Sequence, residues 1–275
     1  MGTKNSYTGG GGKAGKDLRM EIEDWLDSLP EPPEGESEPP DGPPEPDTPT
    51  IRPELLLPAT TLFASRPSTH SDGPSGGGGV ARSGGPGPAG GGSTRRGGGA
   101  QRSVAAASRT AGRAAAAAYA LRTGNAGVLR DLGLDYESLR SNPDVVDVAR
   151  QIMVAACGPL PDGTIEEEEQ RVVAAQVAQW VLEENAEGAP PSPEEIVRET
   201  IAYVIFEAVN NETAAMVHDG RHPEWATAEA ERRMRQTAQA LALRVELSPE
   251  GPTPAEFSEA IAQGIETMRD IWGTS

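Results

Sequence analysis

The chemically most distinctive residues stand at the very start of the chain, which opens Met1-Gly2-Thr3-Lys4-Asn5-Ser6-Tyr7-Thr8 and continues with four glycines. Gly2 is small, so we expect Met1 to be removed, which leaves a glycine α-amine at the tip of a flexible arm. An α-amine titrates at about pH 7.7–8.0 in model peptides, so much of it is deprotonated near neutrality. The sequence therefore predicts a presented N-terminal amine that can act as a nucleophile or an acylation site.

Two known motifs overlap this arm, and both are better explained by its composition. Met1 to Ser6 fits the N-myristoylation pattern, but the Ala-, Arg- and Gly-rich, Lys-poor composition is typical of a GC-rich bacterial gene, whereas the modification is eukaryotic. Gly10 to Lys16 fits Gly-x4-Gly-Lys, but Asp17 stands where a Walker A loop needs Ser or Thr for magnesium. We expect neither a lipid anchor nor a nucleotide site here.

Other residues able to do chemistry are too scattered to predict a catalytic centre. His218 and His222 are four residues apart, as in some metal sites, but Gly220 and Pro223 break the helix that would align them, and a third ligand is missing. Cys157, the single cysteine, has no histidine near it in sequence and reads as a small core residue. The sequence predicts a protein that is not an enzyme and needs no metal or cofactor.

Composition places the chain in a broad class. It has 275 residues, a net charge of −18, and 33 Gly and 25 Pro concentrated before residue 100. A single cysteine allows no internal disulfide and favours a reducing compartment. No apolar run approaches the length of a membrane span, about 20 residues. We therefore expect a cytoplasmic protein.

The charge is divided unevenly along the chain. Residues 31–50 carry seven acids and no base, whereas residues 73–130 carry eight arginines and no acid. The arginines are Arg82, Arg95, Arg96, Arg102, Arg109, Arg113, Arg122 and Arg130. Solvated disorder is the simplest interpretation of both blocks. An Arg/Gly tract can also bind nucleic acid, although stacking aromatic residues are absent from it until Tyr119.

An isolated amphipathic segment, Asp17 to Leu29, interrupts the low-complexity region. Its apolar residues recur at helical spacing, and they are Leu18, Ile22, Trp25, Leu26 and Leu29. Trp25, Leu26 and Leu29 are candidate anchors for a partner groove, and a second apolar island at Leu62 and Phe63 is another candidate docking site. Docking on the chain's own folded domain is the alternative for the helix, and the sequence does not separate the two.

The elements behind these sites divide the chain into four parts. We expect a flexible N-terminal arm at 1–16, a short amphipathic helix at 17–29, a disordered linker at 30–99 that is first Pro/Glu-rich and then Gly/Arg-rich, and an α-helical bundle at 100–275. Capping boxes at Thr164, Ser192 and Thr253, each with Glu three residues later, mark helix starts. We also expect an N-cap at Asn142 and a C-cap at Gly124. No segment alternates like a strand, so the predicted fold is all-α, with a C-terminal bundle of five to seven helices.

Several of these pieces together resemble one family, the B subunit of Qat-type bacterial antiphage defence systems (QatB). The similar segments are Met1 to Gly10, Trp25-Leu26-Asp27 before a Pro-rich spacer, Thr61 to Ser65 before the Gly/Arg tract, the Ala/Arg helix from Val104, and Cys157 through Asp162-Gly163-Thr164-Ile165-Glu166. The resemblance covers most of the chain in layout. The acidic helix before Trp25 departs from the shorter Pro/Leu-rich lead expected in the family.

The resemblance implies a non-catalytic subunit of an antiviral defence complex. It would work beside a QueC-like modifying enzyme, a KAP-type P-loop ATPase and a TatD-like nuclease. QueC-like enzymes activate a carboxyl-deazaguanine and join it to an amine, so the hypothesis is N-terminal modification at Gly2, with Thr3, Lys4, Asn5, Ser6 and Tyr7 recognised by the enzyme. Two alternatives remain: a simple adaptor without modification, and a nucleic-acid-binding protein that uses the Arg/Gly tract.

Overall fold

The fold was analysed in a computed structural model of the whole chain. The structure describes residues 12–29, 51, 56, 59, 63–64, 102–158, 165–186, 188–243 and 253–272. Within these residues the protein is all-α, as predicted, with nine helices and one pair of two-residue strands. The helices are α1 (Gly12–Asp27), α3 (Val104–Thr123), α4 (Ala126–Asp131), α5 (Tyr136–Ser141), α6 (Val145–Cys157), α7 (Ile165–Glu183), α8 (Pro193–Val217), α9 (Glu224–Ala242) and α10 (Pro254–Trp272).

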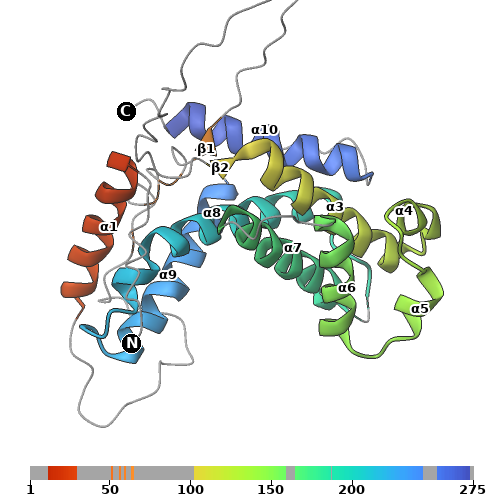
Figure 1. Cartoon of the computed structure of the whole chain (residues 1–275), viewed down its shortest axis with the longest axis horizontal. Helices are drawn as coiled ribbons and strands as arrows, with labels where there is room; N and C mark the ends of the chain where they lie inside the picture. The colour runs from red at the N-terminus through yellow and green to blue at the C-terminus, as the bar shows by residue number, and fades with distance from the viewer. Residues whose placement is uncertain are drawn as a thin grey trace, which may run out of the picture.

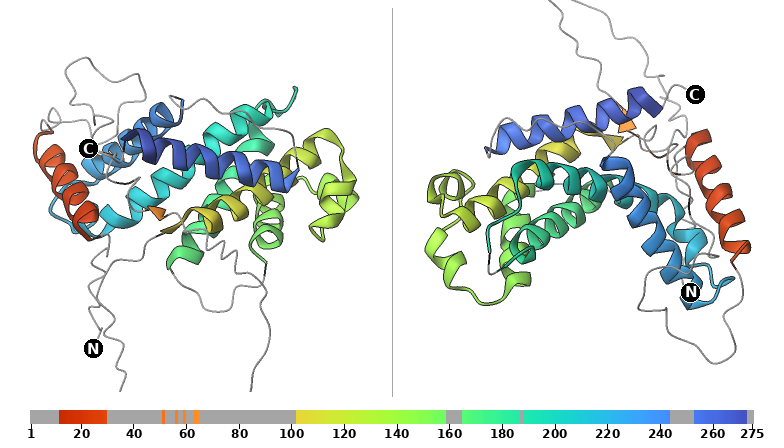
Figure 2. Two further views of the ribbon diagram at one scale, coloured as in Figure 1. Left: turned by 90° about the horizontal axis from the view of Figure 1, so that it is seen from above. Right: turned by 180° about the vertical axis from the view of Figure 1, so that it is seen from behind.

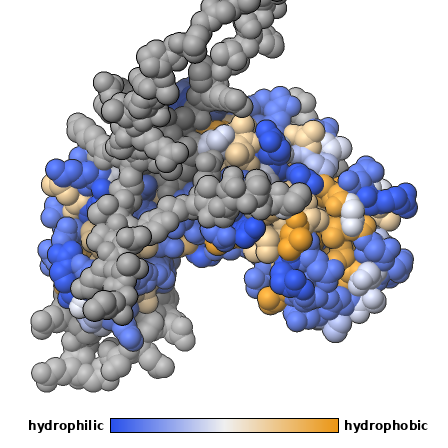
Figure 3. Space-filling model, viewed as in Figure 1, coloured by the Kyte–Doolittle hydropathy of each residue, from blue (hydrophilic) through white to orange (hydrophobic). Residues whose placement is uncertain are grey.

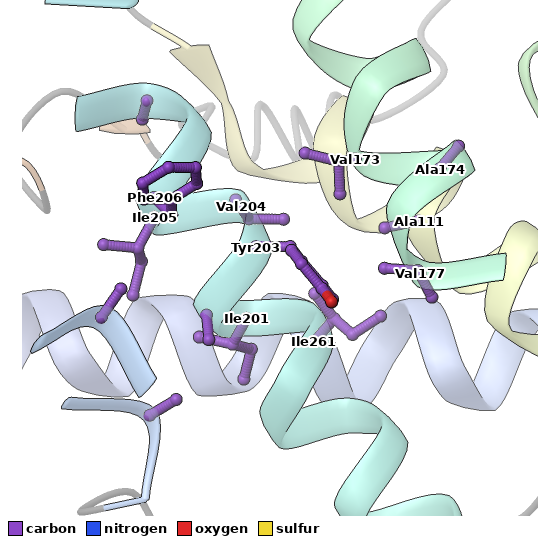
Figure 4. Packing of buried hydrophobic residues seen from close by; sticks show 14 of the residues in the cluster. Ala111, Val173, Ala174, Val177, Ile201, Tyr203, Val204, Ile205, Phe206 and Ile261 are labelled. Carbon is purple, nitrogen blue, oxygen red and sulfur yellow. The ribbon is translucent and has the colours of Figure 1, made fainter. Parts of the chain in front are cut away.

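Helix α8 forms the centre of the molecule. Its own apolar side chains point outward on all sides of the helix and are buried. It packs against α7, α9, α10, α3 and α1. Ile205 and Phe206 point to one side of α8, while Tyr203 and Val204 point to the other (Figure 4). A helix that is apolar on every side must be covered on every side, which explains why so many helices pack around α8.

The Ala-rich helix α3 allows the other helices to approach closely. It packs against α10, α7 and α6, and α10 lies along it in all three views (Figures 1 and 2). A Cβ built on Gly112 would lie 2.6 Å from the backbone nitrogen of Ser258 in α10, so the two backbones are nearly in contact. Only glycine fits at this crossing without displacing α10.

The chain forms one short strand pair beside the bundle. β1 (Phe63–Ala64) pairs in parallel with β2 (Arg102–Ser103), with Phe63 opposite Arg102 and Ala64 opposite Ser103. Each strand has two residues, too few to show the alternation of a strand, so neither was predicted. The pairing places Ala64 and Arg102 close together, although 37 residues separate them in the sequence.

Several predicted helix ends are confirmed. Gly124 is the C-cap of α3, with a left-handed φ of 76°, and Ser192 with Glu195 forms the capping box of α8. One cap differs from the prediction: α6 is capped by Asp144, which accepts hydrogen bonds from the amides of Val146 and Asp147, while Asn142 is the C-cap of α5. The sequence did not predict α5, so the role of Asn142 as its C-cap was missed.

Candidate functional site

The predicted modification site, Gly2, and its recognition residues Thr3, Lys4, Asn5, Ser6 and Tyr7 lie outside the described residues. Description begins at Gly12, where α1 starts five residues before the predicted helix start at Asp17. The described part of the structure that lies nearest to the N-terminal arm is α1, which follows the arm directly.

Helix α1 docks on the bundle through its predicted apolar stripe. Leu18, Ile22, Trp25 and Leu26 are all at most 6% exposed, and Leu29 packs against the same core. The main neighbour of α1 is α8, and α1 lies at the opposite end of the molecule from α4 and α5 (Figures 1 and 2). A helix of 16 residues is marginal in water by itself, so this burial is what stabilises α1.

A partly buried ion pair fixes the position of α1 along α8. The Arg19 guanidinium lies 3.2 Å from a carboxylate oxygen of Glu212, whose side chain is 5% exposed. A Cβ on Gly15 would lie 2.7 Å from the same oxygen, so the absence of a side chain at Gly15 makes room for Glu212. Sliding of α1 along α8 would separate the Arg19 guanidinium from the buried Glu212 carboxylate, so this contact disfavours such a shift.

A second ion pair holds the other half of α1 at the surface. Glu23 accepts a hydrogen bond of 2.7 Å from Arg221 in the loop between α8 and α9, and Arg221 also pairs with Asp219. These side chains are partly exposed, and exposed ion pairs contribute little free energy, about 0–1 kcal/mol. These ion pairs therefore serve mainly to orient α1 relative to the loop between α8 and α9.

Glu21 of α1 is an acidic side chain that is partly buried. One of its carboxylate oxygens is buried without a hydrogen-bond partner. Burial, together with the negative charges of Asp17 and Asp24, raises the pKa of this carboxyl group. The docked position of α1 is therefore less favourable when Glu21 is ionised.

The predicted linker contributes to the core at four described positions. Ile51, Leu56, Ala59 and Phe63 are at most 3% exposed. The carbonyl oxygen of Ile51 accepts a hydrogen bond of 3.2 Å from the Thr237 hydroxyl on α9. The chain between α1 and β1 is thus attached to the bundle within the range 30–99.

These contacts bear on the residues predicted to dock a partner. Trp25, Leu26 and Phe63 are buried within the chain itself, which is the intramolecular alternative that the sequence left open; Leu62 lies outside the described residues. Partner binding through these side chains stays a prediction and requires them to leave the core. Sequence analysis missed Gly15, Arg19, Glu212 and Arg221, because contacts between residues almost 200 positions apart leave no local signal.

Two of the remaining candidate groups, His218 and Cys157, lie at helix ends. His218 caps α8, with its Nε2 atom 3.3 Å from Glu231. Cys157 is half-buried, and burial raises the pKa of its thiol. Among the described residues, no three His, Cys, Asp or Glu side chains are grouped so that they could hold a metal ion.

Two arginines of the Arg/Gly tract bind other helices of the bundle. Arg122 donates hydrogen bonds of 2.8–3.1 Å to five carbonyl oxygens at and beyond the end of α7. Arg113 donates to the carbonyl of Ala155 in α6 at 3.0 Å. Arg109 and Arg130 are exposed, and Arg82, Arg95 and Arg96 lie outside the described residues.

On the face shown in Figure 3, hydrophobic side chains gather at the right of the view. Val146 and Val154 of α6 and Val172 of α7 are large hydrophobic residues that are exposed. No helix in the described part combines the length and apolar character required to cross a membrane.

Comparison with known proteins gives no relative. The sequence matches no protein-family description and no curated protein, and the fold matches no solved structure.

Proposed function

We propose that this chain is a non-catalytic subunit of a Qat-type antiphage defence system, which presents its N-terminal glycine for modification. The observation that supports the proposal is the docking of α1 on α8. Four buried apolar side chains and the Arg19–Glu212 ion pair attach the base of the arm to the bundle. The arm therefore has a defined origin, as a presented substrate requires.

The length of the arm limits where a modifying enzyme can bind. Eleven residues precede α1, and a fully extended chain spans at most about 3.6 Å per residue, so Gly2 can reach no more than about 40 Å from Gly12. The active site of the modifying partner must lie within this distance of the α1 end of the molecule. A partner bound only at the distant α4–α5 end is a poorer fit.

The chemistry proposed at Gly2 is amide formation. A QueC-like partner would activate the carboxylate of a carboxyl-deazaguanine with ATP, and the neutral Gly2 amine would attack the activated carboxyl carbon. The nucleotide leaves, the amine loses a proton, and an amide joins the deazaguanine to the chain. Thr3 to Tyr7 would occupy the enzyme's binding channel, while the bundle carries the ATPase and nuclease partners.

Substitution of Gly2 tests the proposal directly. Gly2→Trp should retain Met1 and crowd the amine, so the protein co-produced with the QueC-like partner should show no added mass. The matched control, Gly9→Trp, introduces the same side chain into the same arm beyond the recognised residues and should still be modified. An adduct on the N-terminus of the Gly2→Trp protein would refute the proposal.

The two alternative functions predict different results. A simple adaptor would retain its partners through residues 17–63 whether or not Gly2 is changed. A nucleic-acid-binding protein would retain single- or double-stranded DNA with a steep salt dependence. The internal hydrogen bonds of Arg113 and Arg122 occupy two of the arginines on which this second alternative depends.

A further inference from the structure

Helix α6 carries an exposed apolar face. Val146, Met153, Val154 and Cys157 recur at positions i, i+7, i+8 and i+11, so they lie on one side of the helix. Val146 is 61% exposed and Val154 is 55% exposed, while Met153 and Cys157 are half-buried. We call this side of the helix the outer face of α6.

The opposite side of α6 already makes the contacts of this helix with the bundle. Val148, Ala149, Ile152 and Ala156 are at most 3% exposed, and α6 packs mainly against α7 and α3. The outer face is therefore a second apolar side, beyond what packing in the bundle requires. Neighbouring exposed apolar side chains mark an interaction surface, whereas isolated ones, such as Leu243, need no explanation.

The start of α7 extends the outer face. Burial raises the pKa of the Cys157 thiol, and the charges of Arg171 and Glu168 also act on this thiol, which places the first turns of α7 close to the end of α6. Val172 is exposed on these turns, and Glu168 accepts a hydrogen bond of 2.8 Å from Arg171 beside it. The apolar surface thus continues from α6 onto α7 and carries a neutral ion pair at this edge.

The charges of α6 are balanced and complement each other. Asp147 and Arg150 are the charged residues of this helix, and they form an ion pair at its surface. Because the whole chain has a net charge of −18, two copies repel each other over most of their surface, but this helix is neutral. When two copies of α6 pack antiparallel about a two-fold axis, Arg150 of each copy approaches Asp147 of the other, so the face is complementary to itself.

We propose that the outer face of α6, together with Val172, is the contact between two copies of this chain. The two α6 helices pack antiparallel, with Met153 and Val154 of both copies near the two-fold axis. The 13 residues of α6 span about 20 Å, so this contact buries less than the roughly 1,200 Å² of a standard interface and forms a weak dimer. The contact involves neither α1 nor Gly2 and is independent of the proposed function.

Sedimentation equilibrium of the full-length protein tests the proposal, at concentrations from about 1 to about 300 µM that span the dissociation of a weak interface. The unaltered protein should change from monomer to dimer over this range. Val154→Glu should weaken the dimer at least tenfold, because each dimer then contains two negative charges near its axis. The matched control, Leu243→Glu, adds the same charge at a leucine that is 67% exposed elsewhere and should change the dissociation constant less than twofold. Both substituted residues are exposed, and unfolding in urea checks that both variants keep the stability of the unaltered protein.

Cross-linking locates the contact. In a Cys157→Ala background, Val154→Cys should give a covalent dimer with a short bis-maleimide, and Leu243→Cys should not. A protein that stays monomeric up to the highest concentration would overturn the proposal. A dimer that Val154→Glu leaves unchanged, or that Leu243→Glu weakens equally, would also overturn it, as would binding of this face to a different protein while the chain alone remains a monomer.

Discussion

Replacement of Ile22 by alanine should release α1 from the bundle. The Ile22 side chain is 0% exposed, and truncation of a buried isoleucine to alanine typically costs about 2–5 kcal/mol. Since α1 is marginal as an isolated helix, this loss appears as local unfolding. At 1.4 kcal/mol per factor of ten, this loss should increase the population in which α1 is undocked by a factor between about 30 and several thousand.

The assay is hydrogen–deuterium exchange of peptides that cover α1, compared with peptides of α3 and α7. Met20→Ala is the matched control, because Met20 lies on the same helix and is 52% exposed. Exposed substitutions usually change stability by less than about 0.5 kcal/mol, so exchange in α1 should change about twofold. Equal protection of α1 in the Ile22→Ala and Met20→Ala proteins would refute the docking described above.

Three further predictions concern the bundle and the pH dependence of α1. Gly112→Ala should destabilise the protein by about 2 kcal/mol in urea unfolding, because the clash with the Ser258 backbone outweighs a helix-propensity gain of about 1 kcal/mol; a more stable variant would contradict the α3–α10 contact. Arg122→Met should cost about 1–2 kcal/mol in the same assay, because five carbonyl oxygens lose their donor, and Arg122→Lys should recover only part of it. The pKa of Glu21 is raised in the folded state, so docking of α1 should strengthen as the pH falls from neutral towards the ordinary range of a glutamate, and weaken as the pH rises. Hydrogen–deuterium exchange in α1, measured against pH, should show this dependence, and the Glu21→Gln substitution should abolish the dependence.

Local sequence signals predicted much of the helical framework. The left-handed C-cap at Gly124 and the capping boxes at Ser192 and Thr253 depend on residues within four positions of each other, so pattern reading located them. The apolar stripe of α1 was recognised for the same reason. Helix α5 was missed because its six residues are too short to show a period.

The arrangement of the helices could not be predicted in the same way. Gly15 and Arg19 meet Glu212 across almost 200 residues, and Ile51 meets Thr237 across 186 residues. Such contacts depend on the complete fold. Arg122 shows the same limit, because an arginine in a basic tract gives no sign that it will bind the carbonyl oxygens at the end of α7.

Residues within the predicted linker show how composition can hide a contribution to the core. Ile51, Leu56 and Phe63 stand in a short stretch of leucine, proline and polar residues that shows no helical or strand period. They become buried because the bundle offers complementary apolar surface. Whether these apolar residues pack on the chain itself therefore depends on the tertiary structure and not on the local sequence.

The intact mass of the unaltered protein, produced alone and together with the QueC-like partner, tests the proposed presentation of Gly2 most directly. We predict loss of Met1 in both samples. Only the second sample should show an added mass that matches a purine-sized acyl group, joined as an amide and mapped to Gly2. The same Met1-trimmed mass in both samples would contradict modification at Gly2 and favour the simple adaptor.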